Sequence, residues 1–173
     1  MRLALAAAFV AALTIVAQAQ TAIDARLMGQ LKQLFPAAAS FSPRGGQPPH
    51  FKAYSGANQQ GSVIGYAFWT TDLQPLERAY DGPIKMLVGL DPNAALSGII
   101  VVEHREPYGD FSIDLPSFPA QFASKDIRDP FRVGGDIDAV SRATITVTSA
   151  TRAVRNSARR IARAFLTPPG GTR

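Results

Sequence analysis

The stretch Asp136-Ile-Asp-Ala-Val-Ser-Arg-Ala-Thr-Ile-Thr-Val-Thr-Ser149 gathers two carboxylates, one arginine and a run of hydroxyl side chains. A pair of glycines precedes it, and an arginine-rich amphipathic segment follows it. A helix N-terminus has unpaired N–H groups and a partial positive charge, so it stabilises a nearby phosphate. Arg142 adds a fixed positive charge, and the hydroxyls can donate to phosphate oxygens or be esterified by phosphate. The stretch therefore suits a phosphate-bearing ligand, although Thr-Ile-Thr-Val-Thr also suits a strand with one polar face.

The first nineteen residues have the pattern of a secretory signal peptide. Arg2 supplies the positive start, residues 3–16 form the apolar core, and Ala17-Gln-Ala19 is a small-residue cleavage site. The apolar run is shorter than the roughly 20 residues that a membrane span requires. We therefore predict a signal peptide over residues 1–19, cleaved near Ala19, and a single exported, periplasmic domain over residues 20–173.

The composition excludes several classes of protein. The chain has 173 residues and 46% hydrophobic content, typical of a globular domain, and it has no cysteine. Disulfides, c-type haem attachment and thiolate-bound iron–sulfur clusters are therefore excluded, and two histidines make a histidine-rich metal site unexpected. The net charge is +5, but the basic residues concentrate in the C-terminal segment rather than among aromatic side chains. We predict neither a metal nor a nucleic-acid partner.

The hydrophobic patterns predict an alternation of helices and strands. Helical spacing of apolar residues indicates one helix from about residue 22 to 35, capped by Thr21, and another over residues 149–166, capped by Thr148 or Ser149. The strands are expected at 62–71, 83–90 and 96–104, with a short one at 131–133, a loop over 40–60 and a helical turn near 119–122. The predicted fold class is α+β: a twisted, mainly antiparallel sheet flanked by an N-terminal and a C-terminal helix, in a single domain.

Three aromatic residues are candidates for contact with a ring-shaped ligand, namely Trp69, Tyr66 and Phe131. Trp69, the single tryptophan, suits the core of the domain as well as the wall of a pocket. Gly65, in the same predicted strand, leaves room for the close approach of another side chain. The charged residues 103–110, at the end of a strand, suit either a binding site or a solvated strand end.

The segment Asp138-Ala-Val-Ser-Arg-Ala-Thr144 resembles the flavinylation motif Asp-x-x-Ser/Thr-Gly-Ala-Thr of FMN-binding domains. Such domains occur in the FMN-carrying subunits of the sodium-pumping quinone reductase and the Rnf complexes, and in the NosR and NirI regulators. The Asp-Pro-Asn turn at Asp91, His104-x-Glu-Pro-x-Gly109 and Gln121-Phe122 have similar counterparts in the same order.

The resemblance implies FMN joined through its phosphate to Thr144, in a phosphoester made by a flavin transferase from FAD with magnesium. Ser141, Ala143 and Asp138 match the motif and are expected to serve transferase recognition and the shape of the turn. Glu106 and Trp69 complete our set of candidate cofactor-binding residues, which also includes Arg142.

The chain departs from the family pattern in three ways. Arg142 stands where the family has glycine. Either the turn forms with negative φ and the guanidinium contacts the phosphodiester, which we favour, or flavinylation is impaired. The sequence His104-Arg-Glu-Pro lacks a common Thr-Pro pair, which points towards the NosR-like side. No multi-span membrane part or cysteine-rich part follows, so we expect the flavin domain alone.

The predicted function is electron transfer by a covalently bound flavin in a periplasmic respiratory chain. The expected partners are the flavin transferase and redox proteins, membrane-associated ones among them. No residue is a candidate catalytic acid or base, so an electron-transfer flavoprotein is favoured over a stand-alone enzyme. Two alternatives stay open: a binding or regulatory module without flavin that docks an acidic partner through its arginines, and a flavin-dependent reductase.

Overall fold

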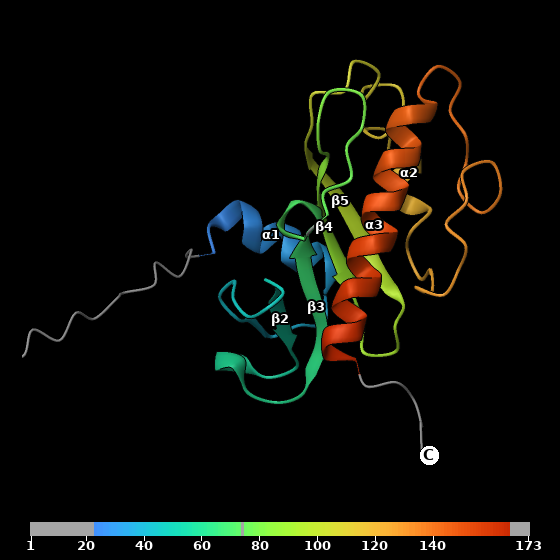
Figure 1. Ribbon diagram of the computed structural model, residues 1–173. Coiled ribbons are helices and arrows are strands. Elements are labelled where there is room, and N and C mark those ends of the chain that lie inside the picture. Colours follow the sequence, from blue (N-terminus) through green and yellow to red (C-terminus); the bar gives the residue numbers. More distant parts are fainter. Residues whose placement is uncertain (1–22, 74, 167–173) are drawn as a thin grey trace, which may run out of the picture.

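Five strands form one antiparallel sheet in the order β1-β2-β3-β4-β5, so every strand pairs with its neighbour along the chain (Figure 1). The computed structural model describes residues 23–73 and 75–166. The strands are β1 (Ser40–Phe41), β2 (Phe51–Tyr54), β3 (Val63–Trp69), β4 (Lys85–Leu90) and β5 (Leu96–Glu103). The helices are α1 (Ala25–Leu34), α2 (Ser117–Ala120) and α3 (Thr144–Phe165), with 3-10 turns η1 (Ala57–Gln59) and η2 (Thr70–Asp72). The predicted α+β class is confirmed.

Helix α3 covers one face of the sheet (Figure 1). Val147, Val154 and Ile161 recur every seven residues, lie on one side of the helix and are fully buried. They belong to the larger hydrophobic core together with Phe68 and Val88 of the sheet. Burial of this apolar stripe is what holds α3 in place.

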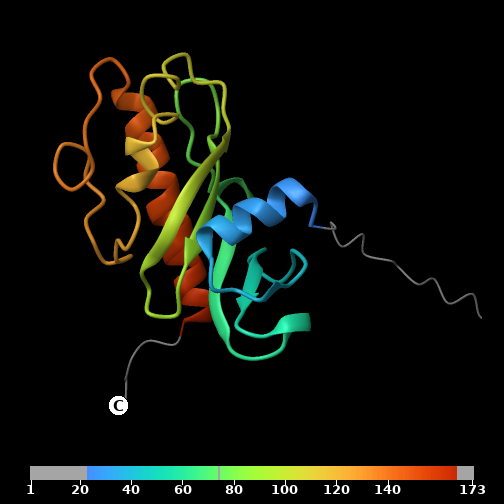
Figure 2. The ribbon, with the colours of Figure 1, turned by 180° about the vertical axis from the view of Figure 1, so that it is seen from behind.

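Helix α1 packs against the opposite face of the sheet, which gives three layers (Figure 2). Leu31 and Phe35 belong to a second core with Phe51 and Leu87. The ring of Phe35 lies directly over Gly65, where an added Cβ would stand 2.1 Å from Cε1 of the ring. The predicted close approach at Gly65 is confirmed.

The prediction for the N-terminal third was partly wrong. Helix α1 begins at Ala25, and its N-cap is Asp24, whose side chain accepts a hydrogen bond from the Leu27 amide at 2.7 Å. Thr21, the predicted cap, lies outside the described residues. The predicted loop over residues 40–60 contains β1 and β2, because alternate residues such as Phe51 and Ala53 are buried against α1 while the glycines and prolines form the connections.

The predictions for strand β3 and for the β4–β5 hairpin are confirmed, and α2 lies two residues before the expected helical turn. The strand at residues 131–133 was wrong, since only an isolated bridge joins Val133 to Ile137. The start of the last helix was also wrong: α3 begins at Thr144, so Thr148 and Ser149 lie inside it. Burial of the segment against the sheet overrides the strand preference of its β-branched residues.

Across 23–73 and 75–166, no helix is both long and apolar enough to cross a membrane.

Candidate functional site

A tight turn over residues 140–143 leads into α3 at the end of the molecule where the loops around residues 80 and 108 also lie (Figure 1). The amide of Ala143 donates to the carbonyl of Val140 at 3.1 Å, and Arg142 has φ of +68°. The prediction of a negative φ at Arg142 was wrong. The turn requires the left-handed conformation that glycine adopts readily, and the exposed arginine accepts it at a cost of about 1 kcal/mol. The backbone at Arg142 therefore has the left-handed conformation that a glycine at this position of the motif would adopt.

Thr144 is the first residue of α3 and is exposed to solvent. No side chain caps the helix; the residue before it, Ala143, is buried and accepts the amide of Val147 at 2.9 Å. That bond is the first one of the helix, so the N–H groups of residues 144–146 have no acceptor within the helix. The Thr144 hydroxyl thus lies beside free backbone donors and at the positive end of a 22-residue helix, where an anion is stabilised.

The Glu106 carboxylate, only 7% exposed, ties the start of α3 to two loops. One oxygen accepts the hydroxyl of Thr146 at 2.6 Å and the amide of Tyr80 at 3.1 Å. The other oxygen accepts the amide of Asp81 at 2.8 Å. Hydrogen bonds to a charged group are stronger than neutral ones, so one buried carboxylate orders three segments next to Thr144.

Four exposed apolar side chains belong to the segments that Glu106 joins or to the loop that follows it. Tyr80 is 69% exposed and bonds to Glu106 through its amide, while Ile145 is 58% exposed and precedes Thr146, which bonds to the same carboxylate. The rings of Tyr108 and Phe111, also exposed, lie 5.5 Å apart in the loop that follows Glu106. Exposed apolar groups close together are typical of a binding surface. We name Tyr80, Tyr108, Phe111 and Ile145 the apolar rim.

The structure brings only one of the three candidate aromatic residues near α3's first turns. Trp69 is partly buried and packs against the core on the α1 face, with the Lys85 ammonium 4.9 Å from the centre of its ring. Tyr66 stacks on Phe165, the last residue of α3, with ring centroids 5.4 Å apart. The helical rise places that residue about 30 Å from Thr144. Neither ring therefore lies beside the motif.

Phe131, the third candidate, is buried and lines a hollow of about 370 Å³ on the side of α3. Thr148 lies one turn after Thr144 on the same helix face and lines that hollow. The other walls are Pro130, Arg132, Val133, Arg152 and Arg155. The hollow is basic, in contrast to the apolar rim.

Polar contacts of Asp136 and Asp138 hold the first residue of the motif and the residues just before it. The amide of Asp138 donates to the side-chain oxygen of Gln121 at 2.6 Å. The Asp136 carboxylate accepts the amides of Phe131 and Arg132 and pairs with Lys125 at 3.0 Å. Burial alone would raise the pKa of Asp136, but these hydrogen bonds and the ammonium lower it below its ordinary value. Asp138 and Ser141 themselves are exposed, as recognition by another protein requires.

Sequence reasoning missed Thr146, Tyr80 and Ile145. Had residues 144–149 been predicted as a helix, its periodicity would have placed buried Thr146 on a different face from exposed Thr144 and Ile145. No sequence signal links Tyr80 to Glu106, because their bond is between segments that meet only in the tertiary structure. Among the residues that the structure describes, no group of three or more His, Asp and Glu could hold a metal ion.

Comparison with known proteins adds independent information about the same region. Residues 79–159, which include Glu106, the motif and most of α3, match the family model of the FMN-binding domain. The chain is 29% identical over 126 residues to one subunit of the ion-translocating oxidoreductase complex of Methanosarcina acetivorans, covering 67% of this chain and 64% of that protein. It is 33% identical over 116 residues to the equally named protein of Haemophilus influenzae, covering 61% and 52%. The match thus spans between half and two thirds of each relative.

Proposed function

We propose that the chain carries FMN covalently on Thr144 and transfers electrons, and the match of residues 79–159 to the family model of the FMN-binding domain supports this proposal. One observation carries the attachment site: Thr144 is exposed at the first position of α3, behind a turn in which Arg142 takes the left-handed conformation of the motif glycine. FMN supplies the redox chemistry, and the protein supplies attachment, orientation and electrostatic environment.

The described residues fit the parts of FMN. The phosphate, joined to Oγ1 of Thr144, would lie at the helix N-terminus with its free backbone donors and near the Arg142 guanidinium. The apolar rim offers exposed aromatic and aliphatic surface for the isoalloxazine ring. Ile145 lies in the first turn of α3, and the Glu106 carboxylate joins that turn to the Tyr80 amide. The basic hollow beside Thr148 suits a ring less well, because three of its walls are arginines.

Attachment requires a second protein. A threonine hydroxyl is a weak nucleophile without a base. The carboxylate bonded to the first turn of α3, Glu106, is buried and bonded to Thr146 rather than to Thr144. A flavin transferase with FAD as donor satisfies the chemistry. The Thr144 oxygen forms a bond to the FMN phosphorus, the pyrophosphate bond of FAD breaks, AMP leaves, and a base of the transferase takes the hydroxyl proton. The exposed Asp138 and Ser141 are the residues that such an enzyme would contact.

The cellular setting is part of the proposal. The signal-peptide pattern of residues 1–19 supports export and a periplasmic domain. The likeness to subunits of an ion-translocating oxidoreductase complex supports membrane-associated redox partners. The sequence around His104 favours a NosR-like variant of the family.

Intact mass spectrometry tests the proposal. Chain co-produced with a flavin transferase should begin at Gln20, gain the mass of FMN less water, and fluoresce on a denaturing gel. Thr144→Val should lose both signals. Thr148→Val is the matched control, since it removes a hydroxyl one turn along the same face and should keep the flavin. Unmodified wild-type mass, or a Thr144→Val protein that still carries flavin, would refute attachment at Thr144.

A further inference from the structure

One face of α3 carries a row of arginines in register with Thr144. Thr144, Thr148, Arg152, Arg155, Arg159 and Arg163 follow one another at spacings of three or four residues, so they lie on a single helix face. The helix contains neither aspartate nor glutamate. The four arginines therefore form a basic strip, which we call the arginine face, and which starts about 12 Å from Thr144 by the helical rise.

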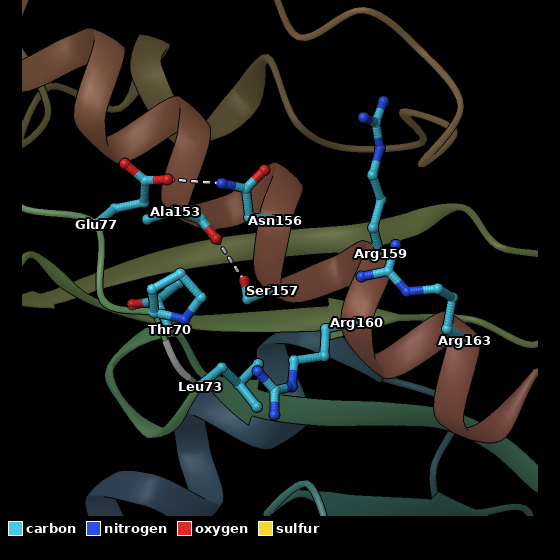
Figure 3. A pocket seen from close by; sticks show the side chains of 10 residues that line it. Thr70, Leu73, Glu77, Ala153, Asn156, Ser157, Arg159, Arg160 and Arg163 are labelled. Atoms are coloured by element: carbon cyan, nitrogen blue, oxygen red, sulfur yellow. Dashed lines mark hydrogen bonds between the residues drawn. The ribbon is translucent and has the colours of Figure 1, made fainter.

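A hollow of about 350 Å³ borders the arginine face on the side of the sheet (Figure 3). Its α3 wall includes Asn156, Arg159, Arg160 and Arg163. Its other wall is formed by Thr70, Leu73, Pro75 and Glu77. Asn156 donates to the Glu77 carboxylate at 2.6 Å across the hollow. Arginines of α3 therefore line both this hollow and the one beside Thr148.

The charges of this face are held close together. The Arg159 guanidinium donates to the carbonyls of Ile127 at 2.7 Å and Asp129 at 2.9 Å, which fixes it against the 127–130 loop. Burial, and then repulsion from Arg155 and Arg163, lower the pKa of Arg159. Glu77 is the carboxylate nearest to Arg152, at 3.9 Å. Mutual repulsion of this kind is relieved when an anionic surface binds.

We propose that the arginine face is the docking surface for an acidic protein partner that exchanges electrons with the group on Thr144. The proposal rests on the proposed function. Because the arginine face and Thr144 lie on the same face of α3, a partner docked on the arginines would lie next to the flavin. Complementary charge steers a partner to the correct face and raises the association rate without requiring a large interface. A lipid surface fits less well because, among the residues that the structure describes, the large exposed apolar side chains lie in the apolar rim and at Leu115 rather than between the arginines.

The test uses the flavin-free chain, so that its result does not depend on flavin attachment. We expect a short glutamate-rich peptide, titrated into isotopically labelled protein at low salt, to shift amide signals of residues 148–163. We do not expect it to shift those of Ala25–Leu34. Arg155→Glu and Arg163→Glu should each weaken binding about tenfold, and added salt should weaken it further. Arg155→Lys keeps the charge and should bind within about twofold of wild type.

Arg26→Glu is the matched control, since Arg26 is exposed on α1 at the opposite face and the substitution makes the same charge change. Weakening by Arg26→Glu equal to that by Arg155→Glu would show a non-specific response to net charge and overturn the proposal. Signals shifted mainly outside α3, or binding to phosphatidylglycerol vesicles without binding to the peptide, would overturn it as well. A protein that fails to take flavin but binds the peptide through α3 would refute the electron-transfer function and leave the docking surface intact.

Discussion

The hydroxyl of Thr146 donates a 2.6 Å hydrogen bond to the carboxylate of Glu106, which stands 40 residues earlier in the chain, and both side chains are buried. The same carboxylate accepts the amides of Tyr80 and Asp81. The first turn of α3 and two loops therefore depend on one charged group for their relative position. Thr144, the proposed attachment residue, is two residues away from that bond.

Removing the carboxylate should destabilise the domain. Glu106→Ala leaves three donors without their acceptor and should lower the free energy of unfolding by about 3 kcal/mol. Thr146→Val removes one bond and should lower it by about 1.5 kcal/mol, while Thr146→Ser should lie between that variant and wild type. Urea unfolding at neutral pH measures all three. Equal stability of Glu106→Ala and wild type would contradict the role assigned to this carboxylate.

Replacing Arg142 should change stability in a direction set by its backbone. Arg142→Gly relieves the left-handed conformation and should raise the free energy of unfolding by about 0.5 kcal/mol. Arg142→Val, β-branched and poorly suited to positive φ, should lower it by at least about 1 kcal/mol. Flavin incorporation should survive in the glycine variant and fall in the valine variant. Ser141→Ala, at an exposed neighbouring position, serves as the control for stability.

The Asp136 carboxyl should make the domain sensitive to acid. Its pKa is lower in the folded protein than its ordinary value of 3.8, so the folded state binds fewer protons than the unfolded chain in acid. The stability from this group is complete above about pH 5 and is lost as pH falls below about 4. Asp136→Asn should reduce stability at pH 7 and flatten its decline between about pH 4 and 2. Unfolding curves across that range measure the effect, and Lys125→Met, which leaves both backbone donors, should show a smaller change.

The contact between Gly65 and Phe35 predicts a cost for one added methyl group. Gly65→Ala would place its Cβ 2.1 Å from the Phe35 ring, and overpacking should lower the free energy of unfolding by about 2 kcal/mol. Phe35→Leu in the same chain shortens the opposing side chain and should restore part of that loss. Thermal unfolding of the single and double variants measures the coupling. Gly29→Ala, where an added Cβ meets nothing within 4 Å, is the control.

The apolar rim predicts where the isoalloxazine ring of an attached flavin lies. Tyr80→Leu should increase the flavin fluorescence, since it removes an aromatic neighbour, and Ile145→Ser should alter the visible circular dichroism of the flavin. Both side chains are exposed, so stability should change by less than about 0.5 kcal/mol. Trp69→Phe, on the α1 face, should leave the flavin spectra unchanged. Spectra that respond to Trp69 and not to Tyr80 would place the ring elsewhere.

The local sequence pattern was enough to predict those elements whose residue types and turns favour one structure by themselves. The β4–β5 hairpin was predictable because an Asp-Pro-Asn turn joins two apolar arms, and β3 because its β-branched and aromatic residues suit a strand. The strands β1 and β2 in the segment 40–60 could not be predicted in this way. They are short and lie between glycines and prolines, so they depend on pairing with residues of other segments. The start of α3 was missed because β-branched threonines and valine favour a strand locally and become helical through burial against the sheet.

The sequence by itself determined the α+β class, the likeness of residues 79–159 to FMN-binding domains, and Thr144 as the residue to test, because these follow from residue order and local pattern. Only the tertiary structure decided the sign of φ at Arg142, the bond from Thr146 to Glu106, and the separation of Trp69 and Tyr66 from the motif. It also placed the arginine face in line with Thr144, by extending α3 back to that residue. The physical reason is the same in each case: these features depend on contacts between segments far apart in the chain, and a local pattern contains no information about which segments meet.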